Sequence, residues 1–243
     1  MERLSNDLLE RKKSELEENF KIIKDRISEA ACKASRNPKD IKLLAATKTV
    51  EPEIINHAIA LGIDLIGENR VQELISKYDY INKETVDIHL IGHLQTNKVN
   101  KIVDKVSMIQ SVDSVKIARE IGKTASAINK EQDILLEVNI GKEPNKSGIF
   151  PENLLDLAYE ISSIKGVKIR GLMTIPPICI NNKEEIRSYF ARINKLFVDI
   201  KSKKLDNSSI DVLSMGMSND YYSAILEGAS MVRIGSALFG SRK

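Results

Sequence analysis

The chain has 243 residues, of which 42% are hydrophobic and 29% are charged, and its formal net charge is +3. This composition suits a globular protein with a sizeable core, and the near balance of charges excludes a strongly basic surface for nucleic acid. Aromatic residues make up only 5% of the chain and tryptophan is absent, which argues against a surface on which bases stack.

The first element in chain order is an amphipathic helix over about the first 35 residues. Its apolar residues recur at helical spacing and are Leu4, Leu8, Leu16, Phe20, Ile23 and Ile27. Asn37-Pro38 ends the helix, because a residue that precedes proline disfavours the helical conformation. We expect the apolar stripe of residues 1–36 to cover the base of the following domain, and docking of a partner protein on this stripe is the alternative.

From residue 41 onward, short apolar runs alternate with polar segments of helical periodicity. We expect strands at 41–48, 64–69, 87–93, 107–113, 133–140, 167–175, 211–218 and 231–240, and helices at 51–61, 70–80, 114–129, 151–164, 183–203 and 219–227. Such alternation gives parallel strands joined by right-handed crossovers. About eight units without a linker predict a single α/β domain over residues 1–243, a (β/α)8 TIM barrel, with an open doubly wound sheet as the alternative.

Polar residues gather at the C-terminal ends of these runs, the ends that form the active sites of TIM barrels. The alternation of side chains along a strand directs Lys48, Ser214 and Arg233 to the barrel mouth. A lysine and an arginine that converge there require an anionic or electron-rich partner. The full set is Lys48, Glu68, Asn69, His93, Ser111, Asp113, Asn139, Thr174, Ser214, Ser218, Arg233 and Ser236.

Two segments late in the chain suit a phosphate group, namely residues 214–218 (SMGMS) and 233–236 (RIGS). Small residues let backbone N–H groups approach an anion, and the loops after strands seven and eight are a frequent phosphate site of TIM barrels. Lys48, which we expect across the mouth from this site, can hold a carbonyl compound as a Schiff base. The residues alone therefore indicate a phosphorylated carbonyl ligand.

Several other residues of reactive type favour structural roles or have none assigned. His89 is expected to be a hydrogen-bonded core histidine, whereas His93 is equally compatible with function and structure. Glu68, Asp113 and Glu137 show neither the spacing of a metal site nor that of paired catalytic carboxylates. Three methionines are expected to pack in the core, namely Met173, Met215 and Met217.

The cysteines and the N-terminus indicate the compartment. Cys32 and Cys179 lie far apart without CxxC spacing, so we expect free thiols and no zinc site. The N-terminal segment is charged throughout, unlike a signal peptide, and no apolar run approaches the roughly 20 residues that span a bilayer. We therefore expect a cytoplasmic protein that contacts neither membrane nor nucleic acid.

Seven motifs, taken in order, resemble those of the pyridoxal phosphate homeostasis proteins, which are single-domain relatives of the barrel domain of alanine racemase. They are ATKT (46–49), GENRVQE (67–73), HLIGHLQTNK (89–98), KSG (146–148), GLMT (171–174), LSMGMSND (213–220) and VRIGSALFG (232–240). The resemblance runs from about residue 41 to the C-terminus. It implies a TIM barrel with an extra N-terminal helix that carries or buffers pyridoxal 5'-phosphate in vitamin B6 and amino-acid homeostasis, with apo forms of enzymes that use the cofactor as recipients.

The resemblance also assigns roles to individual residues. Lys48 forms the internal aldimine with pyridoxal phosphate, and Arg233 faces the pyridine nitrogen. Val50 stands where the family often has proline, but it matches no cofactor contact. The phosphate is held by Ser218, Gly235 and Ser236, and the ring is surrounded by Asn69, Met173, Ser214 and Met217.

We expect no efficient catalysis by this chain. An arginine beside the pyridine nitrogen keeps it unprotonated, so the ring withdraws electrons poorly. Racemisation also requires an acid on the opposite face, which alanine racemase takes from a second domain, and we expect a monomer without one. The alternatives are a slow racemase whose acid is Tyr221, Tyr222 or Lys146, and another lysine Schiff-base enzyme such as an aldolase, which would not bind pyridoxal phosphate.

Overall fold

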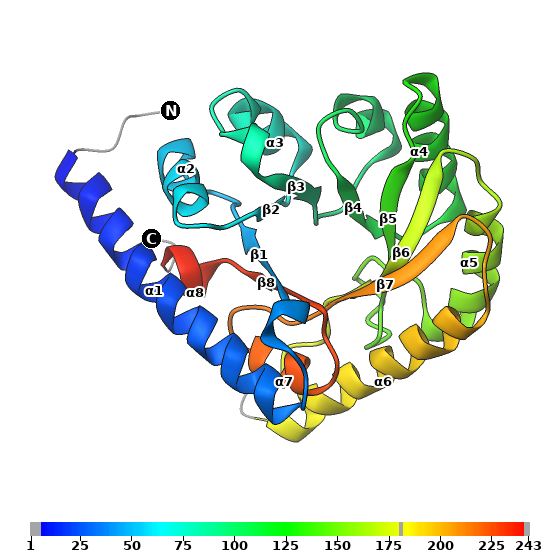
Figure 1. Ribbon diagram of the computed structural model, residues 1–243. Helices are drawn as coiled ribbons and strands as arrows, with labels where there is room; N and C mark the ends of the chain where they lie inside the picture. The colour runs from blue at the N-terminus through cyan, green and yellow to red at the C-terminus, as the bar shows by residue number, and fades with distance from the viewer. Residues whose placement is uncertain (1–5, 180–181, 241–243) are drawn as a thin grey trace.

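The computed structural model describes residues 6–179 and 182–240, and its strands form one closed parallel barrel in sequence order (Figure 1). The last strand pairs with the first, with Ala45 beside Ile234, and this pairing closes the ring. The predicted TIM barrel is therefore confirmed. The strands are β1 (Lys42–Ala46), β2 (Leu65–Glu68), β3 (Asp87–Leu90), β4 (Met108–Val112), β5 (Gln132–Val138), β6 (Val167–Thr174), β7 (Ser208–Ser214) and β8 (Met231–Ile234).

The helices between the strands lie close to the predicted positions. Pro52 begins α2, where a missing N–H costs nothing, and the Asn182 side chain caps α6 by accepting from the Glu185 N–H. The α-helices after α1 are α2 (Pro52–Ala60), α3 (Val71–Tyr78), α4 (Val115–Ala127), α5 (Leu154–Ser162), α6 (Lys183–Ser202), α7 (Tyr221–Leu226) and α8 (Ser236–Phe239). The 3-10 helices are η1 (Pro38–Asp40), η2 (Lys83–Thr85), η3 (Thr96–Lys101) and η4 (Pro151–Asn153).

Two of these elements differ from the sequence-based expectation. The segment 231–240 is not one strand, because β8 ends at Ile234 and the chain turns at Gly235 into the short helix α8. Between β3 and β4 the chain forms the 3-10 helix η3. Within the described ranges, no helix is both long and apolar enough to cross a membrane.

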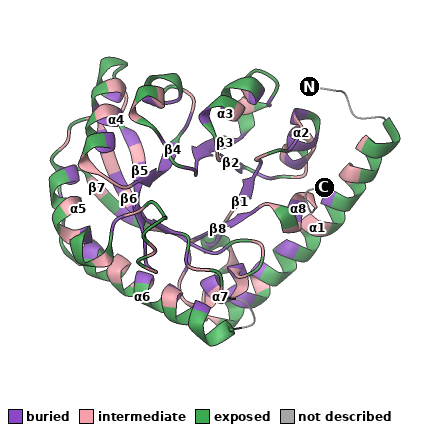
Figure 2. Cartoon of the chain, turned by 180° about the vertical axis from the view of Figure 1, so that it is seen from behind, coloured by how far each residue is buried: buried purple, intermediate pink, exposed green. Residues whose placement is uncertain are grey.

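Alternation along the strands separates a small barrel interior from a large outer core. Figure 2 shows buried residues along the strands and exposed residues along the surrounding helices. The outer core joins the outward side chains of the barrel, such as Ala45, Ile66 and Val232, to the apolar faces of the helices. Burial of this continuous layer is the main source of stability. Inside the barrel are two small clusters, one of Leu44, Ala46, Leu65, Ile91 and Met231 and the other of Met108, Leu135 and Met173.

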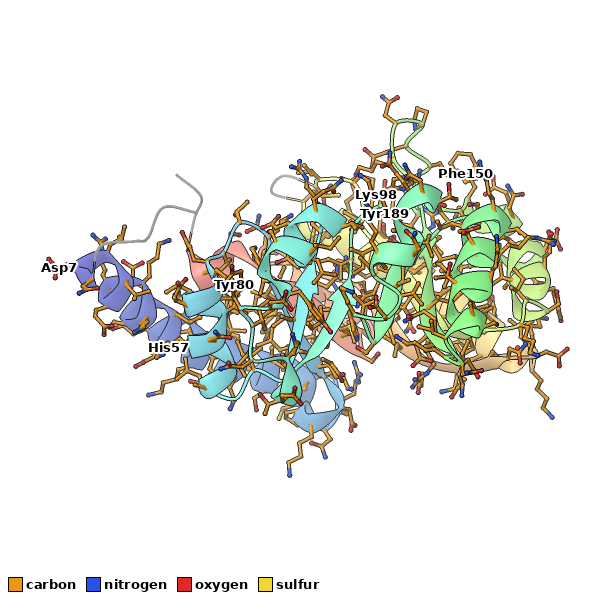
Figure 3. The ribbon with its side chains drawn as sticks, turned by 90° about the horizontal axis from the view of Figure 1, so that it is seen from above. Asp7, His57, Tyr80, Lys98, Phe150 and Tyr189 are labelled. Carbon is orange, nitrogen blue, oxygen red and sulfur yellow. The ribbon has the colours of Figure 1, made fainter. Side chains whose placement is uncertain are left out.

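The helix α1 (Asn6–Lys33) packs along the side of the barrel, against α2, α7 and α8 (Figure 1). The expectation that it covers the base is therefore wrong. The final helix α8 is only a single turn, and α1 covers the side of the barrel beside it. Figure 3 shows His57 of α2 beside α1, where its Nε2 lies 2.8 Å from Glu17 Oε1. The apolar stripe buries Leu16, Ile23, Ile27, Ala30 and Ala31, whereas Leu8 is exposed and Leu4 lies outside the described residues.

Candidate functional site

The ends of β7 and β8 form a small cradle of polar groups. Ser218 Oγ accepts hydrogen bonds from the backbone N–H groups of Gly235 at 3.3 Å and Ala237 at 3.1 Å. Ser236 lies between these two donors in sequence and its side chain is exposed. Backbone N–H groups that converge on one oxygen are the type of donor that binds an anion. The structure therefore brings together Ser218, Gly235 and Ser236, the three residues predicted to hold phosphate.

Gly216 makes the turn that leads Ser218 into this cradle. Its φ of +89° lies in the left-handed region, and a Cβ at this position would lie 2.5 Å from the Ala224 Cβ. The turn is fixed further by Asp220 Oδ1, which accepts from the Met217 N–H at 2.6 Å. Only glycine satisfies both the backbone conformation and the close approach to α7.

Lys48 lies beside the cradle and not across the mouth from it. β1 and β8 are hydrogen-bonded neighbours, and a Cβ on Gly235 would lie 3.3 Å from the Ala46 carbonyl oxygen. Lys48 follows two residues later, half-buried in the turn after β1. The barrel closure therefore puts the lysine loop next to the phosphate-type cradle, and the expectation of opposite positions is wrong.

Arg233 occupies the interior of the barrel just below the mouth, as the strand alternation predicts. Its guanidinium Nη1 donates to Ser214 Oγ at 2.7 Å and Nη2 donates to the Thr174 carbonyl at 2.9 Å. Burial lowers the pKa of Arg233 to about 10, which the nearby carboxylates of Asp220 and Glu137 oppose. The side chain therefore remains a fixed cation at neutral pH.

A chain of hydrogen bonds extends from Arg233 across the interior. Ser214 Oγ donates to Gln110 Oε1 at 2.7 Å, so the Gln110 amide nitrogen is the donor to His89 Nδ1 at 2.8 Å. Each hydrogen bond along this path is donated in the same direction, from β8 to β7, then to β4 and finally to β3. Sequence reasoning missed Gln110, a polar residue in the apolar run of β4 whose only signal is its position in that run.

His89 is the buried end of this chain. Burial lowers its pKa to about 3, so the ring is neutral and its Nδ1 is free to accept from Gln110. The prediction of a hydrogen-bonded core histidine agrees with this geometry. His93, in contrast, is exposed on the rim, where its Nδ1 lies 3.9 Å from Asp113 Oδ2.

Asn69, Met173 and Met217 lie at different depths of the mouth. Asn69 is half-buried after β2, and Gly92 allows its close approach, since a Cβ there would lie 2.1 Å from the Asn69 carbonyl oxygen. Met173 is fully buried in the interior cluster, as expected of a packing residue. Met217 is exposed at the rim, so its expected packing in the core is wrong.

Glu68 is a polar strand end whose side chain does not face the mouth. A Cβ at Gly67 would point at Leu44, inside the barrel. Because successive residues of a strand face opposite sides, the next residue, Glu68, points outward. There the buried Glu68 carboxylate accepts from Thr47 Oγ1 at 2.8 Å and from Lys77 Nζ of α3 at 3.1 Å. The expected position of Glu68 at the mouth is therefore wrong, and the residue belongs to the wall behind Lys48.

Glu137 is a buried acid in the barrel that the sequence spacing did not assign to a role. It shares the inward face of β5 with Leu135, and β5 lies opposite β1 in the ring of eight. Its Oε1 accepts from Ser147 Oγ at 3.2 Å, while Oε2 has no partner. Burial raises the pKa of Glu137, and the carboxylate of Asp113 raises it further. Its signal in the sequence is a charge directly after the apolar residues 134–136 of β5.

The three residues named as an acid for racemisation are buried in the outer core or paired with other residues. Tyr221 is buried in the outer core, and the Tyr222 hydroxyl donates to Glu29 of α1 at 2.9 Å. Lys146 is exposed and forms an ion pair with Glu143. Residues 6–179 and 182–240 contain no group of three or more His, Cys, Asp and Glu side chains that could hold a metal ion.

Comparison with known proteins supplies the family. Residues 13–243 match the alanine racemase N-terminal domain family. A pyridoxal phosphate homeostasis protein of Aquifex aeolicus is 43% identical over 226 residues, which are 93% of this chain and 98% of the relative. The chain belongs to the pyridoxal phosphate homeostasis protein family.

Two solved structures show how far the similarity to this family extends in space. A structure described as an unknown protein from Bifidobacterium adolescentis has a TM-score of 0.90 and 33% identity over 98% of both chains. The PipY protein of Synechococcus elongatus, with pyridoxal phosphate bound, has a TM-score of 0.77 and 33% identity over 88% of this chain and 100% of its own. Over 88% of its length, this chain is thus similar to a protein whose structure holds pyridoxal phosphate.

The residues of the mouth fit pyridoxal phosphate by their own chemistry. A cradle of backbone donors suits the phosphate, and a fixed cation suits the ring nitrogen. The primary amine of Lys48, on the strand next to the cradle, suits the aldehyde. The unpartnered Oε2 of Glu137 is a buried polar atom that a ligand in the mouth can satisfy.

Proposed function

We propose that this protein binds pyridoxal 5'-phosphate at the C-terminal mouth of its barrel and carries or buffers it, with Lys48 as the attachment residue. The observation that carries the proposal is the pairing of β1 with β8, which brings the lysine loop against the Ser218–Gly235 cradle. The pyridoxal phosphate bound to the PipY relative supports the same cofactor for this chain.

The cofactor supplies an aldehyde, which condenses reversibly with a primary amine and releases water. Ser218 and the N–H groups of Gly235 and Ala237 would hold the phosphate and so limit where the aldehyde can lie. Lys48 is the lysine that follows the strand adjacent to that cradle. Binding through one anion site and one amine would retain the cofactor and still allow its release to another protein, because the link to the amine is reversible.

Arg233 supports a carrier and not an efficient enzyme. Two hydrogen bonds fix its guanidinium, and a fixed cation disfavours a second positive charge on a nearby ring nitrogen. A ring without that charge stabilises a substrate carbanion poorly. The names of the relatives, which are homeostasis proteins, agree with this interpretation. We further propose a single-domain cytoplasmic monomer whose recipients are apo-enzymes that require the cofactor.

Glu137 supports a second candidate function, a slow racemase or a similar lysine-dependent activity. The buried carboxyl lies on the strand opposite β1, and burial raises its pKa, which favours the protonated form that a general acid requires. Slow exchange of the Cα proton of alanine in deuterated water, lost in Glu137→Gln, would favour this candidate.

The test is the visible absorption spectrum of the protein with pyridoxal phosphate, before and after borohydride. We expect a yellow band in the wild type that borohydride removes and that Lys48→Ala lacks. Lys42→Ala is the matched control, because Lys42 is an exposed lysine at the opposite end of β1, and its band should be unchanged. A wild type that stays colourless with added cofactor would overturn the proposal and leave an aldolase-type lysine to test.

A further inference from the structure

A buried ion cluster of Lys77, Glu68 and Glu73 lies directly behind the Lys48 turn. Lys77 of α3 is buried, and its ammonium donates to Glu68 Oε1 at 3.1 Å, to Glu73 Oε1 at 2.5 Å and to the Thr47 carbonyl at 2.9 Å. All three N–H groups of the lysine are therefore used. The three acceptors lie in the wall of the barrel behind the mouth. None of them belongs to the cradle of Ser218, Gly235 and Ala237.

The cluster holds both peptide groups that flank Lys48. The peptide before Lys48 is anchored through the Thr47 carbonyl, which accepts from Lys77. The peptide after it is anchored through the Thr49 N–H, which donates to Glu73 Oε1. Glu73 and Lys77 are one turn apart on α3, so a single helix face fixes the backbone on both sides of the lysine.

The backbone of the turn requires such support. Thr49 has a φ of +63°, a conformation that is unfavourable for a β-branched residue. Thr47 is held independently, since its Oγ1 donates to Glu68 Oε1 at 2.8 Å and its N–H donates to the Gly67 carbonyl at 2.9 Å. A strained residue persists only where its surroundings determine its conformation, and such residues cluster at functional sites.

Stability alone is a poor explanation for this cluster. A buried ammonium loses its hydration, and an apolar side chain of similar size often stabilises a core as well or better. What the ion cluster supplies is a defined geometry, because the ammonium must satisfy three acceptors at once. Two of these acceptors, the Thr47 carbonyl and Glu73, fix the backbone on either side of Lys48 and so the direction of its side chain.

We propose that Lys77, with Glu68 and Glu73, is a positioning group that holds Lys48 for its reaction with the cofactor aldehyde. This inference rests on the proposed function of Lys48 as the attachment residue. It assigns a role to the GENRVQE motif, because Glu68 and Glu73 both belong to it.

The experiment compares the wild type with Lys77→Met, Glu73→Ala and Glu73→Gln. Lys77→Met keeps an unbranched apolar chain but removes the donor to Thr47, and Glu73→Ala removes the acceptor of the Thr49 N–H. We expect each to weaken binding of pyridoxal phosphate about tenfold and to shift the pH midpoint of the yellow band. Glu73→Gln keeps an acceptor oxygen and should restore binding to within about twofold. The control is Glu53→Ala, which removes an exposed glutamate from the first turn of α2.

A readout without cofactor complements the spectrum. The rate at which acetic anhydride modifies Lys48, followed by peptide mass spectrometry against pH, should change in Lys77→Met and Glu73→Ala but not in Glu53→Ala. If Lys77→Met does not fold, the Glu73 pair decides, since Glu73 is partly exposed.

The outcomes separate this inference from the proposed function. A wild type with a Lys48-dependent band, together with Lys77→Met and Glu73→Ala variants that fold and match its affinity, pH midpoint and acetylation profile, would overturn the positioning role alone. Equal losses in Glu73→Gln and Glu73→Ala would also overturn it, because the acceptor would then be irrelevant. A wild type without any band would instead remove the proposed function.

Discussion

Arg233 of β8 donates one hydrogen bond of 2.7 Å to Ser214 of β7. This bond joins the guanidinium to the buried Gln110 and His89 deeper in the barrel. The serine hydroxyl accepts from the guanidinium and donates to Gln110, so it has no alternative orientation that keeps both bonds. Because the path ends on a neutral histidine that accepts, each hydrogen bond from Arg233 to His89 is donated in the same direction.

Ser214→Ala should therefore destabilise the protein and loosen Arg233. The substitution leaves a guanidinium N–H and the Gln110 oxygen without partners in a dry interior, which costs about 1–3 kcal/mol of unfolding free energy. We expect faster release of pyridoxal phosphate in a dilution assay, because Arg233 keeps only its contact with Thr174. Ser209→Ala, at the exposed start of the same strand, should change neither quantity. Equal stability and release for the two variants would contradict the role of this path.

Acid should destabilise the protein through His89. Its pKa is about 3 when folded and about 6.5 when unfolded, so between these values only the unfolded chain binds the proton. Stability is therefore lost as the pH falls through about 6.5, and by about pH 5 the loss from this group is about 2 kcal/mol.

The measurement is urea unfolding of the wild type and His89→Gln at about pH 7.5 and about pH 5. The wild type should lose about 2 kcal/mol more than the variant between the two conditions, because glutamine does not titrate. An identical pH dependence in the two proteins would show that His89 does not carry this effect.

Gly216→Ala should disrupt the turn that leads to Ser218. Both Gly216 and Gly62 have positive φ angles, of +89° and +100°, but only at Gly216 would a Cβ lie within 4 Å of other atoms, of which the Ala224 Cβ is the nearest. Gly62→Ala should cost only the conformational penalty of about 1–2 kcal/mol. Gly216→Ala should cost more and should also weaken binding of inorganic phosphate, measured by calorimetry. Similar losses of stability in both variants would indicate that the turn adapts.

Ile23→Ala should weaken the packing of α1 on the barrel, whereas Ile22→Ala should not. Ile23 is 2% exposed and Ile22 is 55% exposed, and the two residues are neighbours in the same helix. The change in helix propensity is therefore the same, and only Ile23→Ala creates a cavity, which costs about 2–5 kcal/mol. Chemical denaturation measures both. A small and equal effect would mean that α1 is not part of the cooperative core.

The alternation of polar and apolar residues was sufficient to predict the barrel and the inward direction of Arg233 and Ser214. It was not sufficient for Glu68, whose neighbour Gly67 has no side chain, so the face of that strand is ambiguous in sequence. Its partner Lys77 comes from the following helix, and only folding brings the two together.

Contacts between distant segments explain the remaining errors. Lys48 was expected opposite the cradle, although the closure of the barrel makes its strand the neighbour of β8. The path from Ser214 through Gln110 to His89 joins three strands, and no spacing in the sequence encodes it. Glu137 and Gln110 are each a polar residue that follows apolar residues within a buried strand, a pattern that indicates burial without saying what the side chain contacts.

The contact of α1 with α8 has a consequence for ligand binding. Asn19 Nδ2 of α1 donates to the Leu238 carbonyl at 3.1 Å, and α8 begins at Ser236, in the cradle. A ligand that orders the start of α8 therefore also favours the docked state of α1, and by thermodynamic reciprocity a firmly docked α1 raises affinity for that ligand. Occupancy of the mouth should then slow amide hydrogen exchange along the first helix of the chain, on the outer wall of the barrel.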